Sequence, residues 1–538
     1  MKSSWTPLYS IALLALLAIS PVVAGGNSCD PGEEPDVIVG AIFDHAKYGT
    51  SNGATGFAIG TESCNVGTCE LDWLSGTPFH PVIGQGMFRL KDGRFTQIGV
   101  GWLKHGFATL DNDLCGTCQD ADGQHLGVNC SDPYWATLNG SQTSLGPRFE
   151  VNATAGTHLH PYTYQGQTSS DPNYKRISVK VSDLDPSRNP GALYFVEGQY
   201  VTEDDAAAGN HFNNSSYRQI VPNAAGNDFS LTGPTFQMES VLWAWQEFGT
   251  GTVKWIDPYI LGGHEVIDVG GGYYRYEYAV HNVNSDQSLM AVNISLPHGV
   301  TLRNIGFADA DYHSGEPFDG TDWAVTYESG SAVHNYIEWT TDAFDVDPNA
   351  NAIRWGTVYN FWFEADVAPT GGGIGTNLPK TGEVFYYKVG AGSPSTRWEV
   401  QGPERCGDSF CDNDETSVSC SADCAPLLPA GEVADDQLVV VLEESGDLTL
   451  AWSASCLGSD SDYGIYEGFI GDFNSHTSRT CSTAGLTSAT LAPTGGGTYY
   501  LVVPNNSIAE GSYGADSQGN PRPAGLAVCM QQEVGSCP

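Results

Sequence analysis

The feature that most constrains this chain is the grouping of its fourteen cysteines. They fall into three sets of even size, and no cysteine lies between residues 131 and 405. Even sets within separate segments are typical of self-contained disulfide frameworks in exported proteins. We therefore predict disulfides within each set and leave the pairing open. The sets are Cys29, Cys64, Cys69, Cys115, Cys118 and Cys130; Cys406, Cys411, Cys420 and Cys424; and Cys456, Cys481, Cys529 and Cys537.

The stretch GWLKHGFATLDNDLCGTC (101–118) allows other interpretations. A redox-active CxxC needs a helix at its first cysteine to lower the thiol pKa, whereas here acidic turn residues surround the motif. Zinc is a second alternative, because Cys115, Cys118, His125 and Cys130 are suitable ligand types in a plausible order. We favour a turn held by disulfides.

The N-terminal segment MKSSWTPLYSIALLALLAISPVVA combines one early lysine, an apolar run and a small-residue ending. This pattern is typical of a secretory signal peptide, with cleavage expected near Ala24. No later stretch is apolar enough to span a bilayer. We therefore expect a secreted, extracellular protein without membrane insertion.

The charge balance is strongly acidic, with 63 acidic residues against 22 basic residues and a formal net charge of −41. Such a field repels phosphates, so we expect no nucleic-acid partner. The same field favours divalent cations, or it reflects a saline environment that screens self-repulsion. The sequence leaves these two explanations open.

Alternating apolar and polar residues, bounded by glycine-rich turns, predict an all-β, mostly antiparallel protein. Examples are DVIVGAIF (36–43), YYRYEYAVHNV (273–283) and VYNFWFEADV (358–367). ESVLWAWQEF (239–248) is also interpreted as a strand, whereas residues 203–208 are compatible with a helix. We expect several β-sandwich-like domains in tandem, with disulfide-stapled N-terminal and C-terminal parts.

Cysteine usage divides the chain into segments, which we take as domains. The expected division is a signal peptide (1–24), a Cys-rich β domain (25–165), a cysteine-free region of one or two β-sandwiches (166–402), a Cys-rich linker module (403–427) and a last β domain (428–538).

Two C-terminal stretches carry a resemblance. LTLAWSASCLGSDSDYGIYEG followed by TYYLVVPNNSIAEGSYG is similar to fibronectin type III-like modules appended to secreted bacterial multidomain proteins, and CGDSFCDNDETSVSCSADC resembles the short CGDGxC-type Cys-rich modules that accompany them.

Residues 36–370 resemble a family of exported bacterial proteins of unknown function. The match rests on HPVIGQGMFRLKDGRFTQIGVGWLKHGF, FVEGQYVTEDDAAAGN, GGYYRYEYAVHNVNSDQS and RWGTVYNFWFEAD. The resemblance implies no activity, so it assigns no catalytic residue.

Clustered acids provide the strongest functional signal in the sequence. Calcium takes six to eight oxygen ligands from flexible loops, and two acidic loops offer such oxygens. Neither loop follows the EF-hand pattern. The calcium candidates are Asp309, Asp311, Asp319, Asp322, Asp345 and Asp347.

Histidines provide a second signal. His158 and His160 would point to one side of a strand, close enough to share a copper or zinc ion. Lys104 and His105 are weak catalytic candidates. The GxSxG match at residues 49–53 lacks the strand and helix of a nucleophile elbow. His264-Glu265 lacks the second histidine of a zincin motif.

These features together predict an extracellular binding or surface-structural protein. Its many aromatic residues beside acids and amides suit a polysaccharide or cell-surface partner. We expect calcium as the possible cofactor and no organic cofactor. The alternative is an exported hydrolase, glycan- or ester-directed, with its active site within residues 36–370 and accessory C-terminal modules.

Overall fold

The computed structural model describes residues 29–119, 121–311, 316–330, 335–369, 380–389, 393–403, 429–433, 438–443, 445–494, 497–506, 509–516, 519–525 and 528–537. The chain separates into two compact units, Met1–Arg405 and Cys406–Pro538. The described residues contain no helix that is both long and apolar enough to cross a membrane. The all-β prediction is confirmed, since antiparallel sheets dominate both units.

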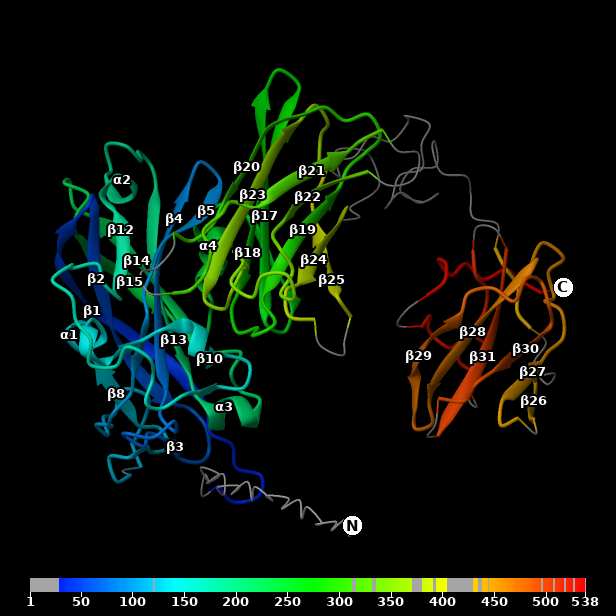
Figure 1. The fold of residues 1–538 in the computed structure, drawn as a ribbon, viewed down its shortest axis with the longest axis horizontal. Coiled ribbons are helices and arrows are strands. Elements are labelled where there is room, and N and C mark those ends of the chain that lie inside the picture. Colours follow the sequence, from blue (N-terminus) through cyan, green and yellow to red (C-terminus); the bar gives the residue numbers. More distant parts are fainter. Residues whose placement is uncertain are drawn as a thin grey trace, which may run out of the picture. The chain divides into compact units, whose positions relative to one another are not determined.

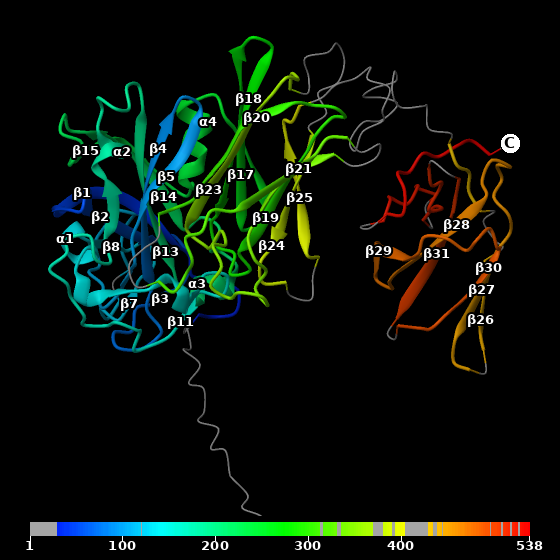
Figure 2. The same ribbon diagram turned by 45° about the horizontal axis from the view of Figure 1, so that its top comes forward.

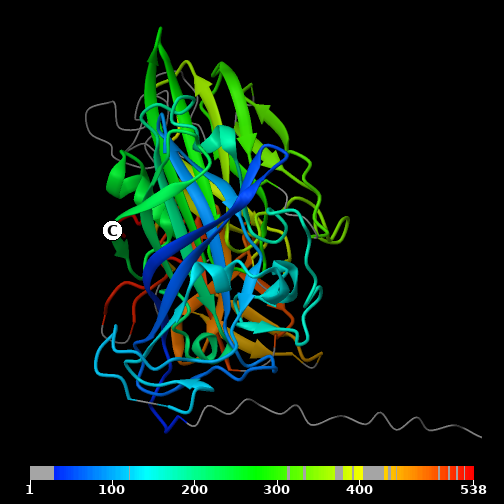
Figure 3. The same ribbon diagram turned by 90° about the vertical axis from the view of Figure 1, so that its left-hand side faces the viewer.

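The first unit begins with a sandwich of two sheets. The smaller sheet has the order β1 (Val37–Ser51), β2 (Ala54–Asn65), β12 (Ile177–Lys180), with β8 (Ser131–Tyr134) also paired to β2. The larger sheet has the order β15 (Phe229–Phe236), β14 (Ser215–Pro222), β13 (Leu193–Val201), β4 (Val82–Lys91), β6 (Leu103–His105), β9 (Leu145–Gly146), with β5 (Arg94–Val100) paired to β4. Figure 3 shows the β1–β2 hairpin, in dark blue, in front of the other strands of this sandwich.

Two short ribbons and several helical turns decorate the first sandwich. The ribbons pair β3 (Leu71–Asp72) with β7 (His125–Leu126) and β10 (Val151–Asn152) with β11 (Thr157–His158). The helical turns are α1 (Ala136–Asn139), η1 (Gln142–Ser144), η2 (Arg148–Glu150), α2 (Val181–Leu184) and α3 (Glu203–Ala208). The helix predicted at residues 203–208 is confirmed; it ends at Gly209, which adopts the left-handed conformation common after a helix.

The expected division near residue 165 does not coincide with the sheets. Strand β12 pairs with β2, and β13 pairs with β4 along nine residues, so segments from both sides of residue 165 build one sandwich. Cysteine content therefore marks where disulfides occur and does not mark where the hydrophobic core ends.

A second sandwich completes the first unit. One sheet has the order β16 (Thr252–Asp257), β17 (Ile260–Gly270), β18 (Tyr273–Asn282), β23 (Thr357–Ala365), β20 (Leu302–Ala308). The other has the order β21 (Ala324–Glu328), β22 (Tyr336–Thr340), β19 (Leu289–Ser295), β24 (Lys380–Tyr386), β25 (Ser395–Val400). Aromatic and aliphatic side chains from both sheets form its core, among them Tyr278, Trp339, Phe361 and Trp398.

The connection between the sandwiches is helical. The strand prediction for residues 239–248 is wrong, because this segment forms η3 (Val241–Trp243) and α4 (Ala244–Phe248). The Ser240 side chain accepts a hydrogen bond from the Leu242 N–H, and the fully buried Trp245 packs in the core between the sandwiches. A short apolar run fits a buried helix as well as a strand, which explains the error.

The two sandwiches share a hydrophobic cluster. It joins Phe88 and Phe95 of the first sandwich to Trp245, Leu261 and Val358. Figures 1 and 2 both place β5 beside β23.

Polar side chains fix the register of β5 against β23. The Gln97 side-chain oxygen accepts a hydrogen bond from the Val358 N–H at 2.9 Å, and the Asn360 amide donates to the Phe95 carbonyl at 2.7 Å. The first unit is therefore a single packed body of two sandwiches.

The predicted disulfides are confirmed for the described cysteines. The pairs are Cys29–Cys69, Cys64–Cys115, Cys118–Cys130, Cys456–Cys537 and Cys481–Cys529. Each pair joins cysteines of the same set. The cysteines of residues 403–427 lie outside the described residues.

The C-terminal unit contains a small sandwich of its own. One sheet has the order β26 (Val439–Leu442), β27 (Leu448–Ala451), β30 (Ser488–Leu491), and the other has the order β29 (Asp472–Thr480), β28 (Asp462–Phe469), β31 (Thr498–Asn505). Leu450, Trp452, Tyr463 and Ile465 form its buried centre.

Candidate functional site

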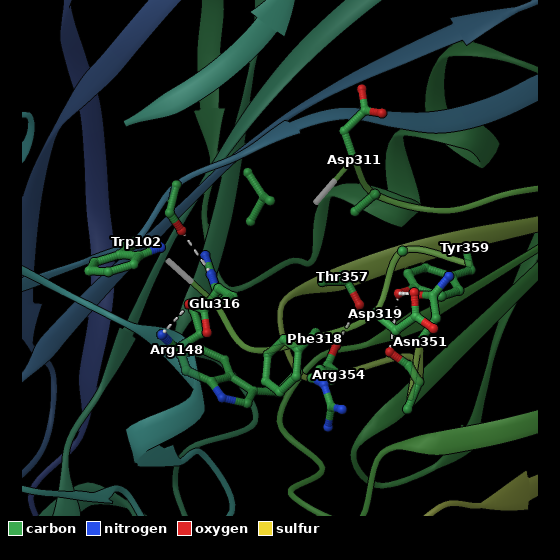
Figure 4. Close-up of a pocket in the computed structure, with 16 residues that line it drawn as sticks. Trp102, Arg148, Asp311, Glu316, Phe318, Asp319, Asn351, Arg354, Thr357 and Tyr359 are labelled. Carbon is green, nitrogen blue, oxygen red and sulfur yellow. Dashed lines mark hydrogen bonds between the residues drawn. The ribbon is translucent and has the colours of Figure 1, made fainter. Parts of the chain in front are cut away.

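A hollow opens in the first unit where the two sandwiches meet. It encloses about 610 Å³ including its open mouth. Its walls come from the segment after β5, from η2, and from the loops that precede β21 and β23 (Figure 4). We call it the interlobe hollow and define it by Trp102, Arg148, Glu316, Phe318, Arg354 and Trp355.

Arg148 occupies the first-sandwich side of the interlobe hollow. Its Nε donates to the Gly101 carbonyl at 2.9 Å, and its backbone N–H donates to Glu316 Oε1 at 2.8 Å. A Cβ on Gly356 would lie 2.3 Å from Arg148 Nη1, so the glycine makes room for the guanidinium. Nη1 is buried and has no hydrogen-bond partner among the described residues.

Arg354 provides a second guanidinium from the second sandwich. Its Cζ lies 3.5 Å from the centroid of the Phe318 ring, and its Nη2 donates to the Ala350 carbonyl at 2.9 Å. Its Nε is buried without a hydrogen-bond partner in the described part of the chain, as is the indole nitrogen of Trp355. Figure 4 shows Arg354 and Phe318 together, between Arg148 and the Asn351 region.

Among the described residues, neither guanidinium forms an ion pair within 4.0 Å, although Glu316 interacts electrostatically with both. Many other basic side chains form ion pairs, such as Arg89 with Asp183 at 3.0 Å and Arg303 with Glu364 at 2.7 Å. Among the described residues, Arg148 and Arg354 form no ion pair. Both guanidiniums line the same hollow in a chain with 63 acidic and only 22 basic residues.

Glu316 is a buried carboxyl group that lines the same hollow, and Asp309 contacts the lining residue Asn351. Burial raises the pKa of Glu316 to about 7, although the Arg148 backbone N–H and guanidinium oppose the shift. Burial also raises the pKa of Asp309 to about 6, while the Asn351 amide donates to its Oδ2 at 2.5 Å. Glu316 can therefore hold or release a proton near neutral pH.

A second hollow of about 690 Å³ continues from the first. The two share Arg148, Phe318, Arg354 and Trp355, and the second extends to Lys388. Together they form a depression with apolar ring walls and unpartnered cationic donors. Such a surface can bind an oxygen-rich ligand that has an apolar face and a negative group.

The predicted calcium ligands only partly converge on this place. Asp311 and Asp319 line the interlobe hollow, but Asp311 pairs with Lys180 at 2.8 Å and Asp319 accepts from the Thr321 N–H at 3.0 Å. In the described part of the chain, no three of the predicted acids bring carboxylate oxygens within 4.8 Å of one another. Calcium binding at these acids stays a prediction.

The remaining calcium candidates take different positions. The electrostatic influence of Asp322 contributes to the raised pKa of Asp309. Asp345 is exposed, and Asp347 Oδ1 accepts a hydrogen bond from the Asn349 N–H at 2.9 Å within its own loop.

The predicted catalytic and histidine candidates lie in another cluster. His105 and His158 meet there with His80, and Lys104 donates a hydrogen bond to the His105 carbonyl. Burial lowers the pKa of Lys104 to about 7. None of these residues lines the interlobe hollow.

The zinc and redox interpretations of the CxxC segment do not fit the disulfides. Cys118 is bonded to Cys130, and Cys115 is bonded to Cys64. These sulfurs are consumed by the disulfides, so they are not available as thiolate ligands or as a CxxC redox pair.

Sequence reasoning missed Arg148, Glu316 and Arg354 as members of one site. Arg148 lies 168 positions before Glu316 in the sequence, so no local sequence pattern links the two residues. Basic residues are scarce in this sequence, so the pair Arg354-Trp355 was the one local feature that could have indicated a binding site.

Comparison with known proteins adds no assignment to this site. No protein-family model matches the chain, and a search of curated proteins finds no match.

Proposed function

We propose that this is an extracellular carbohydrate-binding protein whose interlobe hollow holds a sugar unit that carries a carboxylate. The carrying observation is the pair Arg148 and Arg354, two guanidinium groups with buried unpartnered nitrogens and no ion pair in the described structure. A buried donor without a partner is costly, and a ligand carboxylate satisfies a guanidinium through charge-assisted hydrogen bonds.

The walls of the interlobe hollow support the same ligand class. Trp355, Phe318 and Tyr359 provide apolar ring surface, and Asn351 and Asp319 provide polar groups at the margin. Sugars combine C–H faces with hydroxyl groups, so they match such mixed walls. A carbohydrate ligand outside the cell requires a secreted protein. The disulfides of both units support secretion.

Calorimetric titration with a short oligogalacturonate tests this proposal. The matched ligand is the same oligomer with its carboxylates methyl-esterified. We expect the charged oligomer to bind and the ester to bind at least about tenfold more weakly, which corresponds to about 1.4 kcal/mol. Higher salt should weaken binding of the charged oligomer.

Protein variants locate the binding. Arg354→Gln should lose at least about tenfold in affinity for the oligogalacturonate, because it removes the cation and keeps a polar side chain. Arg397→Gln, at an exposed position on β25 outside the hollow, is the control and should bind as the wild type does. Equal binding of acid and ester, or unchanged binding by a folded Arg354→Gln variant, would reject the proposal.

A hydrolase that acts on the same ligand is the second candidate. The observation in its favour is Glu316, whose pKa of about 7 suits a general acid. Product analysis after incubation with the oligogalacturonate separates the two functions. Cleavage that is lost in Glu316→Gln would favour the hydrolase, whereas an intact oligomer would favour binding alone.

A further inference from the structure

We propose that His80, His105 and His158 form a binding site for a transition-metal ion that prefers imidazole nitrogen, Zn²⁺ or Cu²⁺. The site uses no residue of the interlobe hollow and does not depend on the carbohydrate proposal. One ligand nitrogen from each of the three histidines lies within 4.8 Å of the others. The sequence prediction joined His158 to His160, and the structure adds His80 and His105 to His158.

Three separate segments bring these histidines together. His105 ends β6, where it pairs with Val82 of β4, two residues after His80. His158 ends β11 and pairs with Val151 of β10. The sheet register therefore holds the three backbones in place, and the ligand positions do not depend on one mobile loop.

The distances suit a shared ion. His80 Nε2 and His105 Nδ1 are 2.9 Å apart. Zinc–nitrogen bonds of about 2.0–2.1 Å place two imidazole nitrogens of a tetrahedral site roughly 3.3 Å apart. If the His80 and His105 rings moved slightly apart and the His158 ring moved slightly closer to them, all three residues could bond to one ion.

Neighbouring groups orient the rings. His158 Nε2 lies 2.9 Å from the His80 carbonyl, and its Nδ1 lies 3.2 Å from the Leu159 carbonyl. A neutral imidazole has one N–H, so only one of these carbonyls accepts a hydrogen bond, and the other nitrogen becomes a metal ligand when the ring turns away from the second carbonyl. The Tyr162 ring stacks on His105 with centroids 3.7 Å apart.

The three imidazoles of the cluster are buried away from acidic side chains. His80, His105 and His158 are 2%, 4% and 8% exposed, and no described carboxylate pairs with them. Three imidazole nitrogens without a carboxylate form a ligand set that suits Zn²⁺ or Cu²⁺.

His160 marks the open side of the site. It is half-buried, its ring centroid lies 5.8 Å from that of His80, and its Nδ1 is buried with no hydrogen-bond partner among the described residues. His160 is outside the set of nitrogens that lie within 4.8 Å of one another, so it becomes a fourth ligand only if its side chain moves towards the cluster. An ion can enter from this side because Leu159 beside it is 62% exposed.

The test is metal titration of the full-length mature protein, unreduced, after treatment with a chelator. Zn²⁺ and Cu²⁺ are added separately, and stoichiometry is measured by elemental analysis and competition with a chromophoric chelator. We expect one equivalent of either ion per chain, and nitrogen hyperfine splitting in the Cu²⁺ EPR spectrum. An excess of Ca²⁺ should not displace either ion, because calcium prefers oxygen ligands.

Matched histidine variants locate the metal. His105→Gln and His158→Gln should each lose more than about 100-fold in affinity, and His160→Gln should lose less because His160 lies outside the set of three. His125→Gln is the control; its imidazole already pairs with Asp122 at 2.9 Å, so its loss should leave affinity unchanged. The half-buried His160 position keeps the test informative if a buried variant fails to fold.

Three outcomes would overturn the proposal. The first is less than half an equivalent of bound metal in the wild type. The second is equal metal affinity in the wild type and in the folded His158→Gln and His160→Gln variants, and the third is loss of metal binding in His125→Gln alone. Loss of carbohydrate binding with metal binding intact would reject only the proposed function, because the two sites share no residue.

Discussion

At the scale of residues, this acidic protein buries many of its titratable groups in their neutral form. His281 is 1% exposed, and its Nδ1 lies 2.7 Å from Ser240 Oγ. Burial, with the nearby Arg148, lowers its pKa to about 3. An unfolded histidine has a pKa near 6.5, so the unfolded chain binds a proton that the folded chain refuses between these values. The stability that neutral His281 contributes is therefore present above about pH 6.5 and is lost as the pH falls below it.

We therefore expect the free energy of unfolding to differ between the wild type and His281→Asn by an amount that depends on pH. The asparagine keeps a hydrogen-bond acceptor near the position of Nδ1. The free energy of unfolding in urea is measured for both proteins at pH 7.5 and pH 5. We expect the advantage of the wild type to shrink by about 2 kcal/mol at pH 5, from about 1.4 kcal/mol per pH unit below 6.5. A difference that is the same at both pH values would show that His281 is not held neutral.

The residue scale also shows what the sequence could reveal about the candidate sites. His158 and His160 were singled out because two histidines spaced two apart would share one side of a strand, but β11 ends at His158 and His160 lies beyond it. Their partner His105 was noticed only as an isolated candidate, because its proximity to His158 depends on the pairing of β4 with β6 and of β10 with β11. Arg148 and Arg354 were not recognisable, since a single arginine carries no periodic signal.

At the scale of elements, alternation identified most long strands, and glycine controls how closely the sheets approach. Strands β18 and β23 were predicted within two residues of their observed ends. The strand predicted at residues 36–43 was too short, because β1 continues to Ser51 through partly exposed positions that carry few apolar side chains. Periodicity therefore does not indicate where a strand ends once its apolar pattern stops.

Gly262 of β17 provides a test at this scale. A Cβ there would lie 2.4 Å from the Trp398 ring of the opposite sheet, and Trp398 is 1% exposed. Gly262→Ala should therefore lower the free energy of unfolding by about 1–3 kcal/mol, because the buried indole has to shift. Gly330→Ala is the control, with nothing within 4 Å of its Cβ position, and should change stability by less than about 0.5 kcal/mol. Equal effects in chemical denaturation would contradict this view of the sheet packing.

At the scale of the whole molecule, the interlobe hollow depends on the rigid contact between the two sandwiches. Sequence reasoning identified the β-sandwich class and the disulfide-stapled ends, yet it divided the first unit at residue 165, within a sandwich. The actual junction consists of side chains that cross from β5 of the first sandwich to β18 and β23, two paired strands of the second sandwich. Contacts of that kind have a sequence separation of more than 180 residues and leave no local pattern.

The buried ion triad of Arg94, Arg275 and Glu277 is the polar centre of this junction. Glu277, with a side chain 1% exposed, accepts hydrogen bonds from Arg94 Nε at 2.7 Å and Nη2 at 2.8 Å, and it lies 2.9 Å from Arg275 Nε. The Arg94 guanidinium also lies 3.5 Å from the Trp362 ring centroid. Removing the shared carboxylate would leave two guanidiniums uncompensated at the contact between the sandwiches.

Glu277→Gln should therefore lower the free energy of unfolding of the first unit by about 3 kcal/mol. This value is near the lower end of the range for breaking a buried ion pair, because both arginine side chains are about a quarter exposed. Glu399→Gln breaks the exposed Lys254–Glu399 pair and should cost less than about 1 kcal/mol. Urea unfolding followed by tryptophan fluorescence measures both changes in stability.

If the triad aligns the sandwiches, the folded Glu277→Gln variant should also bind oligogalacturonate more weakly. Its metal affinity should be unchanged, because the histidine cluster lies within the first sandwich alone. Equal destabilisation by the two variants would show that the junction is held by its hydrophobic cluster.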